Sequence, residues 1–85
     1  MNRHKLLKRI SSGDVRNVSF SDLVRLVEGL GFELTRITGS HHVFVHPNIS
    51  ELVNLQDVKG QAKPYQVRQL LKLVERYNLT LARKT

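Results

Sequence analysis

The amino-acid sequence contains no cysteine, and this absence excludes disulfide bonds, thiolate metal ligands and cysteine nucleophiles. It also has no apolar run near the ~20 residues with which a helix crosses a bilayer. The first residues, MNRHKLLKRISSG, lack the apolar region of a secretory signal peptide. We therefore expect a soluble cytoplasmic protein with no membrane partner.

Acidic and aromatic residues are scarce as well. The chain has 7 Asp and Glu against 14 Lys and Arg, which gives a formal net charge of +7. This excess favours a polyanionic partner, because Lys and Arg release condensed counterions when they bind phosphates. Nucleic acid is the expected partner, and an acidic protein is the main alternative. Aromatic residues make up only 6% of the chain, so we expect recognition through the backbone and its shape rather than base stacking.

The length of 85 residues allows one domain and excludes two independent cores. Near the N-terminus, Leu6, Leu7 and Ile10 share one face of a short helix over residues 2–10, which the serines and glycine at 11–13 end. We assign residues 1–18 to an N-terminal helical arm and linker, and residues 19–85 to the main domain. The arm is expected to pack on the main domain or on a partner.

The main domain begins with an amphipathic helix over residues 20–30. Ser19 and Asp22 form an S-x-x-D capping pattern at its start, and Gly31 is the expected stop. Two runs rich in β-formers, 32–37 and 41–46, flank a glycine-containing turn and predict a β-hairpin. A weaker third strand follows over 51–55, and a polar loop covers 56–63.

A second amphipathic helix is predicted from Pro64, which suits the first helical position, to about residue 78. Two amphipathic helices must bury their apolar stripes against the same sheet. The sequence therefore predicts an α+β fold in the order helix, three-stranded antiparallel sheet, helix, with an additional short helix in front. The helices are expected to cover one face of the sheet and to leave the other open to solvent or to a partner.

Three histidines fall close together in the second predicted strand. Because strand side chains alternate between faces, His42 and His46 share a face with Phe44, whereas His41 lies on the other. If Phe44 points into the core, His41 is exposed directly after the turn and can exchange a proton near neutral pH. On spacing alone, this pattern is more often that of a polar hairpin residue with no catalytic role. Zinc is not favoured, because residues 41 and 42 point apart and no cysteine completes a tetrahedral set.

Basic residues gather in the second half of the chain. From Lys59 onward there are seven basic residues and a single acid, Glu75. Such a stripe is often only a solvated helix face, but the local imbalance favours phosphate contact. The candidate RNA or phosphate ligands comprise three residues near the loops and three spaced along the last helix: Arg36, Lys59, Lys63, Arg68, Lys72 and Arg76.

Two strings of the sequence resemble the HicA (YcfA-like) family of mRNA interferase toxins. One is SDLVRLVEGLGF at residues 21–32, and the other is RITGSHHVFVHP at 36–47, whose sharpest element is GSHHxFxHP. The resemblance covers roughly residues 19–79. The chain departs from the family pattern at VNLQ, residues 53–56, where a proline and a further histidine are usual.

The resemblance implies a fold similar to the double-stranded-RNA-binding domain, with residues 19–85 as a HicA-like RNA-binding and ribonuclease domain. It implies that His41 is catalytic and that Gly39, with Ser40, shapes the turn that presents it. The implied activity is that of the toxin of a type II toxin–antitoxin system, a metal-independent endoribonuclease that cleaves mRNA with a histidine general acid or base. The implied partners are mRNA and a HicB-type antitoxin; no cofactor is expected. Two alternatives are a non-catalytic RNA-binding module of the same fold and a basic protein that docks an acidic partner.

Overall fold

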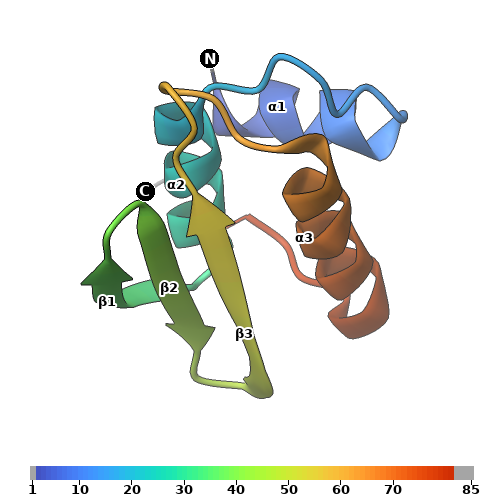
Figure 1. The fold of residues 1–85 in the computed structure, drawn as a ribbon. Coiled ribbons are helices and arrows are strands. Elements are labelled where there is room, and N and C mark those ends of the chain that lie inside the picture. Colours follow the sequence, from blue (N-terminus) through green and yellow to red (C-terminus); the bar gives the residue numbers. More distant parts are fainter. Residues whose placement is uncertain (1, 82–85) are drawn as a thin grey trace.

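The computed structural model describes residues 2–81 and contains three helices and one sheet in that range (Figure 1). The strands form an antiparallel sheet in the order β1-β2-β3. The α+β prediction is confirmed, including the additional N-terminal helix. In chain order the elements are α1 (Arg3–Ser11), α2 (Phe20–Gly29), β1 (Glu33–Thr38), β2 (His41–His46), β3 (Ile49–Gln56) and α3 (Pro64–Tyr77).

Both ends of α2 follow from local sequence. The side-chain oxygen of Ser19 accepts a hydrogen bond from the backbone N–H of Asp22 at 3.1 Å, which is the predicted cap. At the other end the chain reverses at Gly31, whose φ is +104°. The N–H of Phe32 then bonds the carbonyl of Val27 at 3.1 Å, which closes the last turn.

The sheet follows the predicted hairpin and extends the third strand. Gly39 has φ +59° and is the first of two residues between β1 and β2, as in a type II′ turn. The strand β3 covers Ile49–Gln56, whereas the sequence predicted 51–55. The third strand starts earlier because only two residues, 47 and 48, connect β2 to β3. Ile49 therefore already pairs with His46.

The hydrophobic core lies between one face of the sheet and the helices. Phe44 at the centre of β2 is fully buried and packs with apolar residues of α2, β3 and α3. Figure 1 looks onto the other face, with α2 behind the strands and α3 beside β3. The core cluster contains Leu6, Ile10, Val15, Val18, Phe20, Leu23, Leu26, Val27, Leu30, Phe32, Phe44, Val53, Leu55, Ala62, Val67, Leu70 and Leu73.

The N-terminal helix α1 packs on the main domain, which was one of the two expected arrangements. It contacts α2 and α3 on the helical side of the molecule. Its two inward side chains are as buried as any in the core, with 1% of Leu6 and 0% of Ile10 exposed. Residues 1–18 therefore supply core side chains.

Candidate functional site

The face of the sheet that the helices leave uncovered, here called the open face, carries two rows of paired side chains. His41 of β2 lies between Thr38 of β1 and Gln56 of β3. In the next row of the same face, Val43 lies between Arg36 and Asn54. His41 is exposed, whereas Phe44 is buried in the core, so the predicted orientation of the histidines is confirmed.

The imidazole of His41 contacts the side chain of Asn54 on this face. Its Nδ1 lies 3.3 Å from Oδ1 of Asn54 on β3. A carboxamide oxygen can only accept a hydrogen bond, so this contact places the ring proton on Nδ1. Nε2 then keeps its lone pair and can act as a base.

The turn that precedes His41 is tied to the end of β3. The carbonyl of Ser40 accepts a hydrogen bond from the N–H of Asp57 at 3.0 Å. No atom of the described residues outside its chain neighbours lies within 4 Å of a Cβ built on Gly39, so its left-handed conformation is the reason for glycine at this position. The turn therefore fixes where β2 starts, and His41 is the first residue of β2.

The other two histidines of β2 pack on the core side. The ring of His42 lies edge-on to Phe20, with centroids 4.8 Å apart, and that of His46 lies edge-on to Phe32 at 5.1 Å. The Nδ1 of His42 also lies 3.3 Å from the carbonyl of Ser40. Both side chains are partly buried, in contrast to His41.

Both ring nitrogens of His46 are engaged. Nδ1 accepts a hydrogen bond from the N–H of Asn48 at 3.1 Å, so the proton of the neutral ring lies on Nε2. Nε2 donates to the carbonyl of Leu30 at 3.2 Å, at the end of α2. His46 thus joins the end of β2 to α2 and has no free nitrogen for a substrate.

Three of the predicted phosphate ligands precede α3 in the chain, and one of them, Arg36, lies on the open face beside Val43. Arg36 is the diagonal neighbour of His41 across β1 and β2, a position about 7–8 Å away in antiparallel sheets. Lys59 and Gly60 both have positive φ, +53° and +82°, as in a type I′ turn after β3. Lys63 precedes α3, with its Nζ 5.9 Å from the ring centroid of Tyr65.

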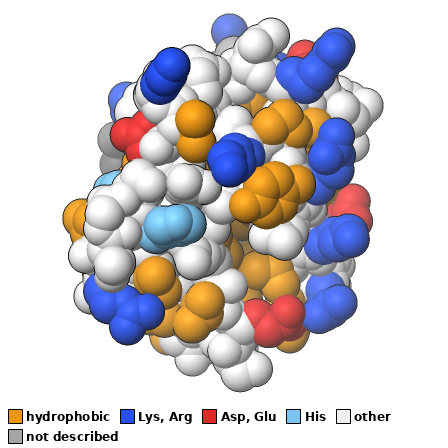
Figure 2. All heavy atoms as spheres, viewed as in Figure 1, with side chains coloured by type: hydrophobic (Ala, Val, Ile, Leu, Met, Phe, Trp, Pro, Cys, Tyr) orange, Lys and Arg blue, Asp and Glu red, His pale blue; other side chains and the backbone are white. Residues whose placement is uncertain are grey.

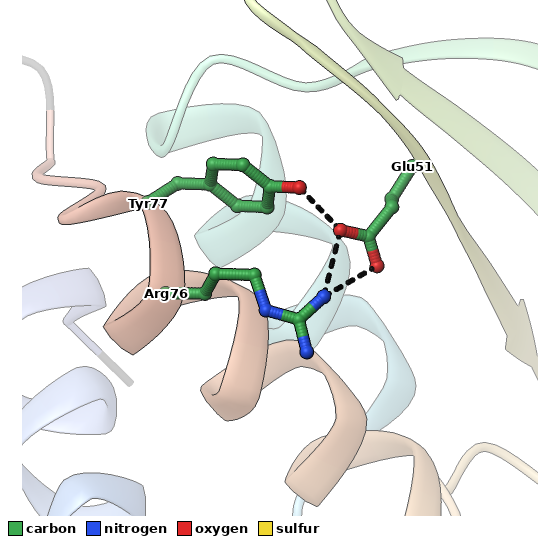
Figure 3. A network of polar contacts seen from close by, with 3 residues as sticks. All are labelled: Glu51, Arg76 and Tyr77. Carbon is green, nitrogen blue, oxygen red and sulfur yellow. Dashed lines mark hydrogen bonds and ion pairs between the residues drawn. The ribbon is translucent and has the colours of Figure 1, made fainter.

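The other three predicted ligands lie on α3, and Arg76 differs from the other two in its surroundings. Arg68 and Lys72 are exposed along the helix. The guanidinium of Arg76 binds both carboxylate oxygens of Glu51 on β3, at 3.0 and 3.2 Å, and the hydroxyl of Tyr77 donates to the same carboxylate (Figure 3). The Tyr77 hydroxyl, followed by Arg76, holds the pKa of Glu51 below its ordinary value. The positive charge of Arg76 is therefore compensated within the molecule.

The space-filling view shows how charge is distributed on this side of the molecule (Figure 2). Lys and Arg side chains follow the border formed by α3, and others lie near the opposite border and near the top. A histidine side chain is exposed between these groups, beside apolar side chains. Val43, on this face, is only 7% exposed. The helix α1 does not cover it, because α1 packs against α2 and α3 on the helical side of the molecule.

Two residues near the open face were not predicted from the sequence. Asn54 faces His41 because of the register in which β2 pairs with β3. The sequence around Asn54 does not indicate this register, so the contact could not be predicted from it. Tyr65 is half exposed in the first turn of α3, next to Lys63. The available sequence signal was its position two residues after Lys63, which the low aromatic content of the chain outweighed.

No helix within residues 2–81 is both long and apolar enough to span a bilayer. In the same range, no three His, Asp or Glu side chains come together in a group that could bind a metal ion.

The comparisons with known proteins agree with the fold and the motif. A family model described as the HicA toxin of bacterial toxin–antitoxin systems matches residues 20–75, from the start of α2 to near the end of α3. No curated protein and no solved structure matched the chain. The matched segment covers well over half of the sequence and includes the hairpin that presents His41. The chain therefore belongs to the HicA toxin family of bacterial toxin–antitoxin systems.

Proposed function

We propose that this toxin is a metal-independent endoribonuclease of a type II toxin–antitoxin system, which cleaves mRNA with His41 as its general acid or base. The observation that carries the proposal is the position of His41. It is exposed on the open face, its Nδ1 contacts Asn54, and Arg36 is its diagonal neighbour on β1. Family membership supports the toxin role, and the excess of positive charge supports a phosphate-bearing substrate.

The chemistry requires a base at the 2′-hydroxyl of the RNA. Nε2 of His41 takes the hydroxyl proton while O2′ forms a bond to the adjacent phosphorus. The bond from phosphorus to the 5′ oxygen breaks, and that oxygen takes a proton from the imidazolium or from water. The products are a 2′,3′-cyclic phosphate and a 5′-hydroxyl. Asn54 serves as a positioning residue, because its carbonyl oxygen holds the proton on Nδ1 and so leaves Nε2 free.

The cations supply the second requirement, since negative charge builds up on the phosphate oxygens as O2′ attacks. Arg36 lies on the same face as His41, and Lys59 and Lys63 lie in the loop that follows β3. Arg68 and Lys72 extend the positive surface along α3 and would contact RNA farther from the cut. Arg76 has the weakest case, because Glu51 already pairs with it.

A HicB-type antitoxin is the proposed protein partner. Its site would include the sheet beyond the His41 row, where Val45 and Leu52 leave apolar surface exposed. Binding there would cover the imidazole and exclude RNA. The net charge of +7 favours an antitoxin with an acidic contact surface.

The test compares His41→Ala with His4→Ala, which changes another exposed histidine on α1. Each protein is incubated with a single-stranded RNA in EDTA, and growth and RNA integrity are followed after induced expression in a bacterium. We expect His41→Ala to lower the cleavage rate about 10²- to 10⁴-fold and to abolish growth arrest, with His4→Ala unaffected. A 2′-deoxy nucleotide at the cut site should block cleavage. Unchanged cleavage by His41→Ala would refute the assignment, and RNA binding without any product would favour a non-catalytic module.

A further inference from the structure

Tyr65 stands out among the aromatic residues of the chain. The three phenylalanines are buried, and the Tyr77 hydroxyl is bound to Glu51. Tyr65, in contrast, is 50% exposed at the start of α3. A half-exposed aromatic ring on a protein with so few of them is a candidate contact for a ligand.

Two neighbours restrain the ring of Tyr65. The ammonium group of Lys63 lies 5.9 Å from the ring centroid, within cation–π range. The side-chain amide of Gln66 donates to the Tyr65 hydroxyl at 3.4 Å. Gln66 itself is only 5% exposed, so it is a fixed support. The ring therefore has a basic and an amide neighbour before any ligand binds.

The same glutamine connects Tyr65 to the row of the sheet that contains His41. Oε1 of Gln66 accepts a hydrogen bond from the backbone N–H of Gln56 at 2.8 Å. Gln56 is the cross-strand partner of His41, and its N–H points away from β2 toward Gln66. The pair is thus one without mutual hydrogen bonds, the kind in which side chains approach most closely. Gln66 thus links the exposed ring of Tyr65 to Gln56, the strand partner of His41.

We propose that Tyr65 and Lys63 form a subsite for a nucleotide that flanks the cut in single-stranded RNA. The ring of Tyr65 stacks on the base, and the ammonium of Lys63 binds the adjoining phosphate. An aromatic ring accepts any base by stacking, and a lysine beside it adds the phosphate contact. The subsite rests on the proposed function for the nature of its ligand. Through this subsite the protein would contact a base by stacking, which the low aromatic content of the chain gave little reason to expect.

The binding test uses His41→Ala protein, so that RNA binds without being cut, and a short fluorescein-labelled oligoribonucleotide as the probe. On this background we compare Tyr65→Ala, Tyr65→Leu and Tyr65→Phe. Phe keeps the aromatic face, whereas Leu keeps apolar bulk without it. We expect Ala and Leu to weaken binding at least about fivefold and Phe to bind like the parent. Lys63→Gln should lower the slope of log affinity against log salt by about one.

A spectroscopic test reports stacking directly, because the chain has 2 tyrosines and no tryptophan. In His41→Ala, Tyr77→Phe protein, Tyr65 is the sole source of tyrosine fluorescence. We expect the oligoribonucleotide to quench this fluorescence. A strand of the same length with abasic nucleotides should bind through its phosphates and leave the fluorescence unchanged.

The outcomes separate the subsite from the nuclease. Absence of cleavage by the wild type, combined with weaker binding by Tyr65→Ala and Tyr65→Leu, would remove the nuclease and retain the subsite. Cleavage that depends on His41, with equal RNA binding by all three Tyr65 variants, would overturn the subsite and retain the nuclease. Equal loss in Tyr65→Phe and Tyr65→Ala would also overturn stacking, because the hydroxyl and its contact with Gln66 would then carry the effect.

Discussion

Nδ1 of His41 and Oδ1 of Asn54 face each other across β2 and β3 at 3.3 Å. This contact orients the imidazole and decides which nitrogen carries the proton. Asn54→Ala should therefore lower kcat about three- to tenfold, the worth of one net hydrogen bond. KM should stay unchanged, because Asn54 acts through His41. Steady-state kinetics with a defined RNA substrate checks this, and unchanged RNA binding on the His41→Ala background excludes a general loss of fold.

Asn54→Asp tests independently whether residue 54 acts on the imidazole of His41. A carboxylate at this position stabilises the protonated imidazolium of His41. The pH profile of kcat/KM should consequently move to higher pH, because more alkaline conditions are needed to free the base. A profile that coincides with that of the wild type would mean that residue 54 does not act on His41.

Leu6 provides a test of how far α1 belongs to the folded unit. It is 1% exposed, whereas Leu7, the next residue of the same helix, is only partly buried. Leu6→Ala should lower the free energy of unfolding by about 2–5 kcal/mol, the cost of an unfilled core cavity, and Leu7→Ala by clearly less. Urea unfolding followed by circular dichroism measures both. Equal, small effects would indicate that α1 is a detachable arm.

The glycine at position 31 carries two constraints at once. Its φ is +104°, and a Cβ there would approach Nε2 of His46 to 2.8 Å. Gly13 has the similar φ of +106° but nothing within 4 Å, so Gly13→Ala measures the backbone cost alone, about 1–3 kcal/mol. Gly31→Ala should cost more than Gly13→Ala.

A double-mutant cycle isolates the steric part. On a His46→Ala background the cost of Gly31→Ala should fall toward that of Gly13→Ala, because the ring that blocks the new Cβ is gone. Equal costs with and without His46 would show that backbone strain alone requires the glycine.

The predictions from sequence succeeded where a short segment determines its own structure. The α2 cap at Ser19, the hairpin turn at Gly39 and the alternation that exposes His41 each depend on a few adjacent residues. The packing of the helices on one face of the sheet then followed, because their apolar stripes must be buried against it. The catalytic role of His41, which the alternation alone left open, comes from the family resemblance and stays a prediction.

Contacts that depend on register or on distant segments were not predictable in the same way. The meeting of His41 and Asn54 requires the pairing of β2 with β3, and that of Arg76 and Glu51 requires the packing of α3 on β3. Neither has a local sequence signal. Arg76 shows the consequence, because a regular basic spacing gave it a phosphate role while the fold supplies it with an internal carboxylate.

The Glu51 carboxylate makes the stability of the protein depend on pH. The hydroxyl of Tyr77, and after it the guanidinium of Arg76, holds the pKa of Glu51 below its ordinary value in the folded state. A lowered carboxyl pKa stabilises the fold fully above the unfolded-state value, and the gain is lost as pH falls through the folded-state value. Glu51→Gln should therefore lower the midpoint of urea unfolding at neutral pH, and the difference from the wild type should disappear in acid. Salt should also reduce it, since the pair is exposed.

The control is Glu28→Gln, which removes an exposed carboxylate from the last turn of α2, where a negative charge opposes the helix dipole. It should not destabilise the protein at neutral pH, although it changes the net charge by the same amount. If Glu51→Gln lowers the unfolding midpoint equally at neutral and acid pH, the carboxylate charge is not the cause. The contribution would then come from packing between β3 and the end of α3, because that packing is the same at both pH values.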